Sequence, residues 1–147
     1  MRRIRIQEEF CIGCRLCEIH CLVQRSKSKK IIKVFQNERD TIVPGVQVEQ
    51  SGYVSFAIQC RHCSEAPCIE TCMTGALHRD PKTGAVLCDQ DRCVGCWMCI
   101  MVCPLGAIRR GANQEVASKC DLCVGADIPA CAANCPNEAL VYEDDEV

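Results

Sequence analysis

Residues 93–108 have the sequence CVGCWMCIMVCPLGAI, and this stretch decides how the chain must fold. Cys93, Cys96, Cys99 and Cys103 are separated by two, two and three residues, and Pro104 follows the last of them. Thiols at this density form disulfides, work as a redox-active pair or bind metal. Whether such a segment holds a metal by itself depends on the other cysteines of the chain.

The composition indicates a single domain whose interior is not filled by side chains alone. The chain has 147 residues, of which 17 are cysteine and only 4 % are aromatic. Aromatic side chains supply much of the buried area of an ordinary core, so a core this poor in them is thin. We therefore expect one domain, residues 1–147, with additional material inside it.

The sequence indicates a reducing compartment. The N-terminal residues MRRIRIQEEFC lack the apolar region and the cleavage site of a secretory signal. No segment approaches the ~18 consecutive apolar residues that a membrane-spanning helix needs. We expect a cytoplasmic protein with no direct membrane span, and in that compartment clustered cysteines bind metal more often than they pair.

The net charge of −2 is unevenly distributed along the chain. Residues 1–40 carry ten Lys and Arg against five Asp and Glu, while the remainder carries seven against fourteen. The basic focus is RSKSKK at 25–30, and the acidic focus is EDDE at 143–146. Each is either a solvated segment or a docking surface for an oppositely charged partner.

Sixteen of the cysteines fall into four groups of four, which we call quartets. Every quartet begins with C-x2-C and ends with C-x3-C, and only the middle gap varies. In chain order the quartets are Cys11, Cys14, Cys17 and Cys21; Cys60, Cys63, Cys68 and Cys72; Cys93, Cys96, Cys99 and Cys103; and Cys120, Cys123, Cys131 and Cys135. A pattern that recurs four times is an internal repeat of one metal-binding unit.

The spacing favours cubic iron–sulfur clusters. Three thiols separated by two residues each can wrap one corner of such a cluster, and the fourth, about one helical turn further on, reaches a neighbouring cluster. The third quartet has the full C-x2-C-x2-C-x3-C-P pattern, and the fourth ends in Cys135-Pro136. Leu22 and Met73 occupy the proline position after the first two quartets, which removes no ligand.

Zinc, a disulfide framework and a thioredoxin-like pair are the alternatives. Zinc ribbons use two separated C-x2-C pairs for each tetrahedral ion, and they require neither the third cysteine nor the x3 step. A thioredoxin-like pair lies in a βαβ pattern, and none surrounds these pairs. Iron–sulfur clusters are the prediction, and a zinc-stabilised interaction module is the alternative from a different class.

If every fourth cysteine crosses to a neighbouring cluster, the quartets work in pairs. The 20 residues 73–92 join the second and third quartets, and this length favours a contiguous inner module, residues 60–108. The first and fourth quartets then form an outer module from residues 1–30 and 112–147. The predicted ligand sets are site 1 (Cys11, Cys14, Cys17 and Cys135), site 2 (Cys120, Cys123, Cys131 and Cys21), site 3 (Cys60, Cys63, Cys68 and Cys103) and site 4 (Cys93, Cys96, Cys99 and Cys72).

Residues 31–59 form an insertion between the first two quartets. Within it, IIKVF at 31–35 and VQVEQSGYVSFAI at 46–58 have the composition of strands, the latter as a hairpin with its turn near 50–52. The expected fold class is α+β: two ferredoxin-like two-cluster modules with a β-hairpin insertion.

The sequence resembles the four-cluster, ferredoxin-like electron-transfer subunits of anaerobic oxidoreductase complexes, which serve formate dehydrogenases, hydrogenases, molybdoenzymes and carbon monoxide dehydrogenase. The resemblance covers nearly the whole chain through EEFCIGCRLCEIHC, VQVEQSGYVSFAIQCRHCSEAPCIETC, CVGCWMCIMVCPLGAI and KCDLCVG…PACAANCPNEAL. It implies four [4Fe–4S] clusters and the same crossed pairing of quartets. The short chain and IRIQEEFCIGCRLCEIHC are most similar to the iron–sulfur subunit that accompanies carbon monoxide dehydrogenase.

Several other residues lie beside the predicted ligands. Cys88, the seventeenth thiol, is expected in a strand as a small buried hydrophobe. His20 and His62 are expected at the surface or behind the ligands, where His62 can tune a cluster by hydrogen bonding. Trp97 is expected to pack and to shield a cluster. Three methionines are expected in the apolar shell of the clusters: Met73, Met98 and Met101.

These observations predict an electron-transfer protein that is not itself an enzyme. Every ligand set is closed by thiolates, and no nucleophile–base pair or phosphate loop is present. The predicted partners are a catalytic dehydrogenase, with carbon monoxide dehydrogenase preferred, and an acceptor such as a hydrogenase or flavoprotein; no nucleic acid is expected. The alternatives are a subunit of a formate dehydrogenase or molybdoenzyme, or a catalytic subunit, which would need a further cofactor.

Overall fold

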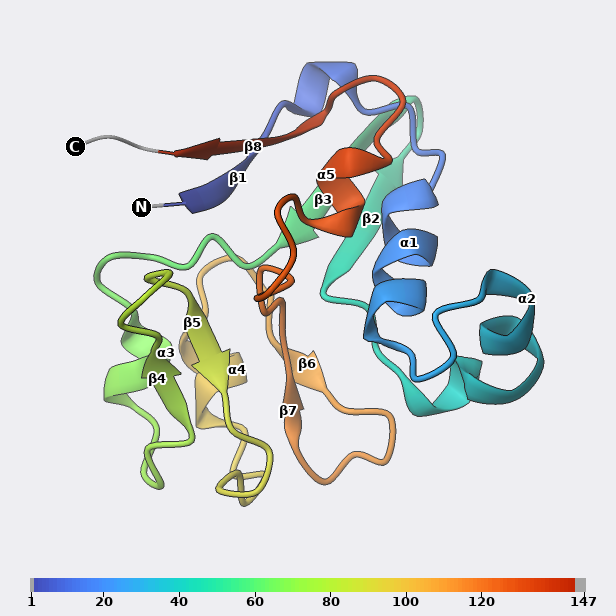
Figure 1. The fold of residues 1–147 in the computed structure, drawn as a ribbon. Coiled ribbons are helices and arrows are strands. Elements are labelled where there is room, and N and C mark those ends of the chain that lie inside the picture. The colour runs from blue at the N-terminus through green and yellow to red at the C-terminus, as the bar shows by residue number, and fades with distance from the viewer. Residues whose placement is uncertain (1, 145–147) are drawn as a thin grey trace.

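The structure, a computed structural model, describes residues 2–144 (Figure 1). Helices and strands are short, and cysteine-bearing loops connect most of them. The helices are η1 (Glu8–Phe10), α1 (Leu16–Arg25), α2 (Ile31–Lys33), η2 (Val34–Glu38), η3 (Arg39–Thr41), α3 (Pro67–Glu70), α4 (Met98–Val102) and α5 (Ala130–Ala133). The strands are β1 (Arg2–Ile6), β2 (Val46–Ser51), β3 (Val54–Gln59), β4 (Leu77–Arg79), β5 (Val86–Cys88), β6 (Arg109–Arg110), β7 (Ala117–Ser118) and β8 (Leu140–Asp144).

Four of the helices are positioned by the cysteine repeat. α1, α3, α4 and α5 each begin one residue before the third cysteine of a quartet. The third and fourth cysteines are four positions apart, which places them on the same side of a helical turn. On α1 these two residues, Cys17 and Cys21, form its buried face. The prediction that the x3 step is one helical turn is therefore confirmed most fully in the first quartet.

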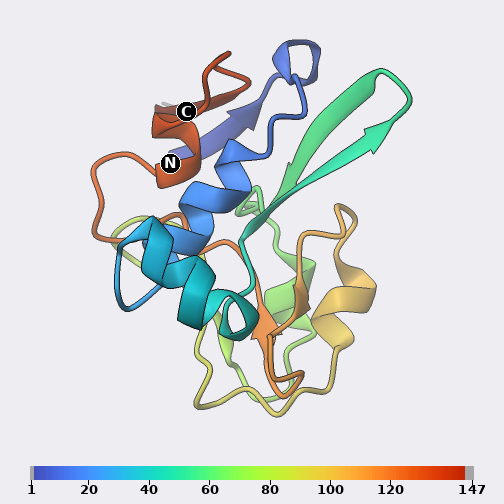
Figure 2. The ribbon, with the colours of Figure 1, turned by 90° about the vertical axis from the view of Figure 1, so that its right-hand side faces the viewer.

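The two ends of the described chain lie side by side. β1 pairs antiparallel with β8, from Arg2 opposite Asp144 to Ile6 opposite Leu140. Close by, α1 packs against α5, and both views show the blue N-terminal and red C-terminal segments together (Figures 1 and 2). The segments that carry the first and fourth quartets thus form one part of the molecule.

The middle of the chain forms the other part. β4 pairs with β5, β6 pairs with β7, and α3 packs against α4. In Figure 1 these elements lie together below β1, β8 and α5. They carry the second and third quartets, so the segments from residues 60 to 118 are neighbours in space as well as in sequence.

The interior is built from cysteines as much as from aliphatic side chains. One group of packed residues joins Ile4, Val48 and Leu140 to cysteines of the first and fourth quartets. A second group joins Leu77, Val86 and Ile108 to cysteines of the second and third quartets. No Phe, Tyr or Trp belongs to the buried core within the described residues. The thin core predicted from the composition is confirmed.

The hairpin within the insertion is confirmed, but the strand predicted at 31–35 is wrong. β2 and β3 pair from Val46 opposite Gln59 to Ser51 opposite Val54, and Figure 2 shows this hairpin extending beyond its neighbours. Residues 31–38 are helical instead, as α2 followed by the π-helical turn η2. Among residues 31–38 only Val34 is buried, so this β-branched run has no sheet to join.

The insertion is held by its own contacts. The Glu38 carboxylate accepts the N–H groups of Lys27 and Ser28 at 2.9 and 3.3 Å, which closes the helical turn onto the end of α1. Hydrogen bonding by Ser28, and then by the backbone of Lys27, lowers the pKa of Glu38. Within residues 2–144, no helix has both the length and the apolar character required to cross a membrane.

Candidate metal centres

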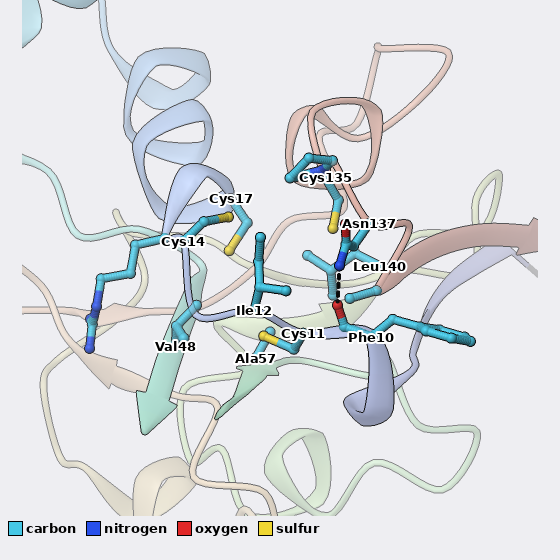
Figure 3. Close-up of a pocket in the computed structure, with 13 residues that line it drawn as sticks. Phe10, Cys11, Ile12, Cys14, Cys17, Val48, Ala57, Cys135, Asn137 and Leu140 are labelled. Atoms are coloured by element: carbon cyan, nitrogen blue, oxygen red, sulfur yellow. Dashed lines mark hydrogen bonds between the residues drawn. The ribbon is translucent and has the colours of Figure 1, made fainter. Parts of the chain in front are cut away.

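The four cysteines predicted for site 1 surround a single cavity. Cys11, Cys14, Cys17 and Cys135 line a space of about 360 Å³, and Figure 3 shows their side chains around it. Three of them come from the loop before α1 and the first turn of that helix, whereas Cys135 follows α5. The Asn137 side chain donates to the carbonyl oxygen of Phe10 at 3.2 Å and ties the two segments together beside the cavity.

Two further cavities repeat this arrangement. The cysteines of site 3, Cys60, Cys63, Cys68 and Cys103, line a space of about 370 Å³. The cysteines of site 4, Cys72, Cys93, Cys96 and Cys99, line a space of about 350 Å³. In each cavity one cysteine comes from a different quartet than the other three. The three volumes are nearly equal, which indicates one repeated unit of construction.

The cysteines of site 2 lie together in the interior. Burial raises the pKa of Cys131 strongly, and the neighbouring Cys120, Cys21 and Cys123 raise it further. Burial likewise raises the pKa of Cys120 to about 12, with Cys21 among the groups that act on it. Cys21 of the first quartet and Cys131 of the fourth also pack in the same core.

The four sites follow one another in a row. Cysteines of sites 1 and 2 share a packed core through Cys17, Cys21 and Cys131. Site 2 meets site 3 where Cys120 packs with Cys60. Sites 3 and 4 share the core that contains both Cys68 and Cys99. The order along the molecule is therefore 1, 2, 3 and 4.

The backbone turns back at the same step of every quartet. The second residue after the first cysteine has a positive φ in all four: Gly13, His62, Gly95 and Leu122, at 68°, 49°, 67° and 58°. Glycine adopts this conformation without cost, whereas His62 and Leu122 adopt it against their preference. The prediction that the chain folds back around the first three sulfurs is confirmed in this local geometry.

Backbone N–H groups point at cysteine sulfurs in three of the sites. The donors and acceptors are Gly45 to Cys21 at 3.1 Å, Leu122 to Cys120 at 3.3 Å, and His62 to Cys60, Leu77 to Cys72 and Ala117 to Cys93, each at 3.4 Å. Such donors stabilise negative charge on sulfur. Gly45 is required at its position, because a Cβ there would lie 2.8 Å from the Cα of Cys120.

The cavities fit clusters better than single ions. Among residues 2–144, no three His, Cys, Asp or Glu side chains converge closely enough to bind one metal ion. The thiols instead stand around three separate cavities, each lined by four predicted ligands, with amide donors directed at several sulfurs. Four thiols around such a space are the ligand set that a cubic iron–sulfur cluster uses.

Cys88 lies in β5, as predicted, but it is only half-buried and lines the site 4 cavity as a fifth thiol. Burial raises its pKa to about 12, and the nearby Cys93 and Cys99 act in the same direction. It therefore faces the site rather than an ordinary aliphatic core.

The two histidines and Trp97 have distinct surroundings. His62 is buried, and its Nδ1 accepts the N–H of Val86 at 2.9 Å. Burial, and then the charge of Lys119, lowers the pKa of His62 to about 3. His20 is half-buried. Trp97 is also half-buried and lines the site 4 cavity, and the Arg110 guanidinium lies 4.8 Å from its ring centroid.

The placement expected for the methionines is wrong. Met73, Met98 and Met101 are exposed, and 81 % of Met101 is open to solvent. Other apolar residues of the cysteine loops are exposed as well, including Ile12 near site 1 and Val94 near site 4. The spacing rules place the cysteines, but they do not determine which neighbouring side chains point inward.

Lys119, beside the first cysteine of the fourth quartet, is buried, which the sequence does not reveal. Its Nζ donates to the carbonyl oxygens of Val86 and, at 2.8 Å, of Cys120. The position of Lys119 directly before a cysteine does not predict that its side chain is buried, because Arg92 holds the equivalent position in the third quartet and is exposed.

Comparison with protein families places most of the chain in one of them. Residues 51–145 match the family model described as a 4Fe-4S dicluster domain. The chain is 37 % identical to the electron transport protein HydN of Escherichia coli K12, over 91 % of this chain and 83 % of that protein. It is 35 % identical to an iron–sulfur protein of Rhodospirillum rubrum, over 90 % and 76 % of the two chains.

One further relative is named as a subunit of an enzyme, and solved structures share the fold. The thiosulfate reductase electron transfer subunit PhsB of Salmonella typhi is 33 % identical, over 92 % of this chain and 71 % of that protein. Among solved structures, a chain of the active site complex BamBC of benzoyl coenzyme A reductase aligns with a TM-score of 0.55 and 20 % identity, covering 97 % of this chain and 76 % of that one. At this identity the structural match shows a shared fold.

Proposed function

The chain belongs to the 4Fe-4S dicluster domain family and is an iron–sulfur electron-transfer protein, and we propose that it carries single electrons along four [4Fe–4S] clusters. The observation that carries this proposal is the lining of the cavities. Residues as distant in sequence as Cys11 and Cys135 meet around one space with the ligand number of one cluster. The sets predicted for sites 3 and 4 likewise line one cavity each.

We assign each cluster to three cysteines of one quartet and the last cysteine of its partner. Site 1 takes Cys11, Cys14, Cys17 and Cys135; site 2 takes Cys120, Cys123, Cys131 and Cys21; site 3 takes Cys60, Cys63, Cys68 and Cys103; and site 4 takes Cys93, Cys96, Cys99 and Cys72. Two modules follow from this assignment, with sites 1 and 2 in the outer and sites 3 and 4 in the inner. The packing of α1 against α5 and of α3 against α4 supports the division.

When bound, the clusters supply one-electron oxidation and reduction without bond chemistry. The residues of the chain exclude water and stabilise negative charge on sulfur. Buried cysteines such as Cys17 and Cys131 exclude water, and the N–H groups of Gly45 and Ala117 stabilise charge on sulfur. Because all four ligand positions of each site are thiols, no position is open to a substrate, which agrees with a non-catalytic subunit.

The order of the sites supports a linear path with two ends. Near site 1, Phe10, Ile12 and Leu16 are exposed. Near site 4, Val94 and Met98 are exposed. Exposed apolar residues that gather around a functional site are typical of surfaces that a partner covers. We infer that electrons enter at one of these ends and leave at the other.

The partner at one end is a catalytic oxidoreductase subunit, because relatives such as the thiosulfate reductase subunit are named as electron-transfer subunits of such enzymes. We propose carbon monoxide dehydrogenase as the donor on the resemblance of the N-terminal stretch alone. A formate dehydrogenase or another molybdoenzyme is the second candidate, favoured by the named thiosulfate reductase and sulfite dehydrogenase relatives. Anaerobic copurification from the host distinguishes the two.

Anaerobic purification followed by iron and sulfide analysis tests the cluster proposal. We expect a brown protein with about sixteen irons and sixteen sulfides per chain. Dithionite reduction followed in an anaerobic spectrometer measures whether about four electrons enter each chain. A colourless protein that contains zinc, or a brown one with about eight irons, would contradict four clusters.

A further inference from the structure

Lys119 places a positive charge in the middle of the molecule. Only 3 % of the residue is exposed, and it directly precedes Cys120 of site 2. Its Nζ donates to the carbonyl oxygen of Cys120 and to that of Val86 in β5. The lysine therefore connects the fourth quartet with a strand of the inner segments.

The protein offers this ammonium group no carboxylate. Both acceptors are neutral carbonyl groups, and within the described residues no Asp or Glu pairs with Lys119. Its neighbour His62 adds no second positive charge, because its Nδ1 accepts the Val86 N–H at 2.9 Å and therefore carries no proton. A charge removed from water needs a counter-charge as well as hydrogen bonds, or its burial is costly. The polypeptide supplies hydrogen bonds to this ammonium group but no counter-charge.

The hydrogen bonds of Lys119 lie at the two central sites. Its Nζ donates to the carbonyl oxygen of Cys120, a predicted ligand of site 2. Its second acceptor is the carbonyl oxygen of Val86, which lines the cavity of site 3. Sites 2 and 3 adjoin where Cys120 packs with Cys60. The cation thus lies between two places that each hold four thiols.

We propose that Lys119 is a positioning residue whose charge is shared by the clusters of sites 2 and 3 and raises their reduction potentials. The proposal rests on the four-cluster function stated above. A cluster with four thiolates is an anion, and reduction adds a further negative charge. A nearby buried cation stabilises the more negative state, so it makes the electron easier to accept. The clusters of sites 2 and 3 therefore have higher reduction potentials than they would have without Lys119.

Redox titration of the anaerobic holoprotein, followed by electron paramagnetic resonance, tests the proposal. Lys119→Met keeps the length of the side chain and removes the charge, and Lys119→Gln removes the charge but keeps a donor. We expect two of the four potentials to become more negative in both variants, while the other two stay at their wild-type values. Lys119→Arg keeps the charge and restores both potentials toward wild type. Lys82→Met, at an exposed turn, is the matched control and shifts none.

Iron content separates the outcomes. Met and Gln variants with full iron and four unmoved potentials would refute the role of Lys119. If the Met and Gln variants lose iron and the Arg variant retains it, the site requires the charge of Lys119, which supports the proposal. If all three variants lose iron, Lys119 has a packing role, which overturns the proposal. A wild-type chain with about eight irons refutes the four-cluster function itself, before any variant is compared.

Discussion

Ile6 is the register partner of Leu140 at the last step of the β1–β8 pair, and beyond it the Gln7 N–H donates to the Ala139 carbonyl oxygen at 2.8 Å. This step fixes the two segments that next enter site 1, one leading to Cys11 and the other coming from Cys135. A two-stranded pair is weak by itself, so its buried side chains decide how firmly site 1 is closed.

Substitution of Ile4 tests this dependence. Ile4 is almost fully buried in β1 and packs in the core that contains Cys17 and Cys131. We expect Ile4→Ala to lower the free energy of unfolding of the holoprotein by about 3 kcal/mol, because it leaves a cavity. Denaturant unfolding under anaerobic conditions measures the change. The adjacent Arg5→Ala removes only an exposed ion pair with Glu143 and should cost less than about 1 kcal/mol; equal effects would show that burial of Ile4 is irrelevant.

The crossed ligand assignment predicts which variants resemble each other. Cys103 belongs by sequence to the third quartet, but it lines the cavity of Cys60. We expect Cys103→Ala and Cys60→Ala to remove the same cluster and to give the same difference spectrum by electron paramagnetic resonance. Cys93→Ala should remove a different one. Each variant should retain about twelve irons per chain. If the Cys103 and Cys93 variants match instead, the quartets are self-contained and the assignment is wrong.

Substitution of Cys88 is predicted to leave all four clusters in place. It lines the site 4 cavity beside four predicted ligands, and the proposed assignment leaves it without a bond to iron. We expect Cys88→Ala to keep about sixteen irons and to cost about 1 kcal/mol in stability, the loss of one small buried group. Cys72→Ala, in the same cavity, should lose one cluster. Iron analysis of the two variants decides between them, and a loss of iron in the Cys88 variant would make Cys88 a ligand.

Gly45 is predicted to be essential for site 2. A Cβ at this position meets the Cα of Cys120 at 2.8 Å, and the Gly45 N–H donates to Cys21. We expect Gly45→Ala to displace the strand entry and to lose the site 2 cluster, leaving about twelve irons. Gly52→Asn, at the hairpin turn, is the control: nothing lies within 4 Å of a Cβ there, and asparagine tolerates the left-handed conformation. Equal iron contents in the two variants would contradict the prediction.

Removal of the clusters should destabilise the fold, because the core of the polypeptide is thin. An unburied cysteine thiol has a pKa of about 8.5, so the thiols of the metal-free chain are mostly protonated at pH 7, and burial raises the pKa of Cys120 and Cys17 further, to about 12. Metal binding must displace these protons, and reconstitution should become slower and less complete as the pH falls from 8 to 6. We also expect the metal-free chain to lack a cooperative thermal transition, measured by circular dichroism. An unchanged transition would show that the polypeptide core suffices.

The spacing of the cysteines predicts more of this molecule than any other feature of the sequence. The x3 step predicted the helical turn that carries Cys17 and Cys21, and this prediction succeeds because it follows from short-range geometry. The assignment of Cys103 to the cluster of Cys60 stays a prediction, and the two cysteines line the same cavity. The β-branched run at 31–35 misled the prediction, since a strand also needs a free edge, and residues 31–38 find none.

The burial of Lys119 could not be predicted from the sequence for a related reason. A lysine before a cysteine looks the same in sequence whether its side chain turns outward or inward, and only the approach of Val86 from a distant strand decides the matter. Exposure of Met73 and Met101 depends in the same way on what packs over the loops. Spacing within a segment is encoded locally, whereas the surroundings of a side chain are not.

The pairing of the first strand with the last also sets a schedule for maturation. Under the proposed assignment, all ligands of the inner sites lie between Cys60 and Cys103, so they are synthesised before Cys120 and the later cysteines. Cys11, Cys14 and Cys17 emerge first of all, yet they wait for Cys135, which reaches them only when β8 can dock on β1. Under the proposed assignment the ligands of the outer sites are therefore completed last, and a chain that stops before residue 135 lacks one ligand of site 1.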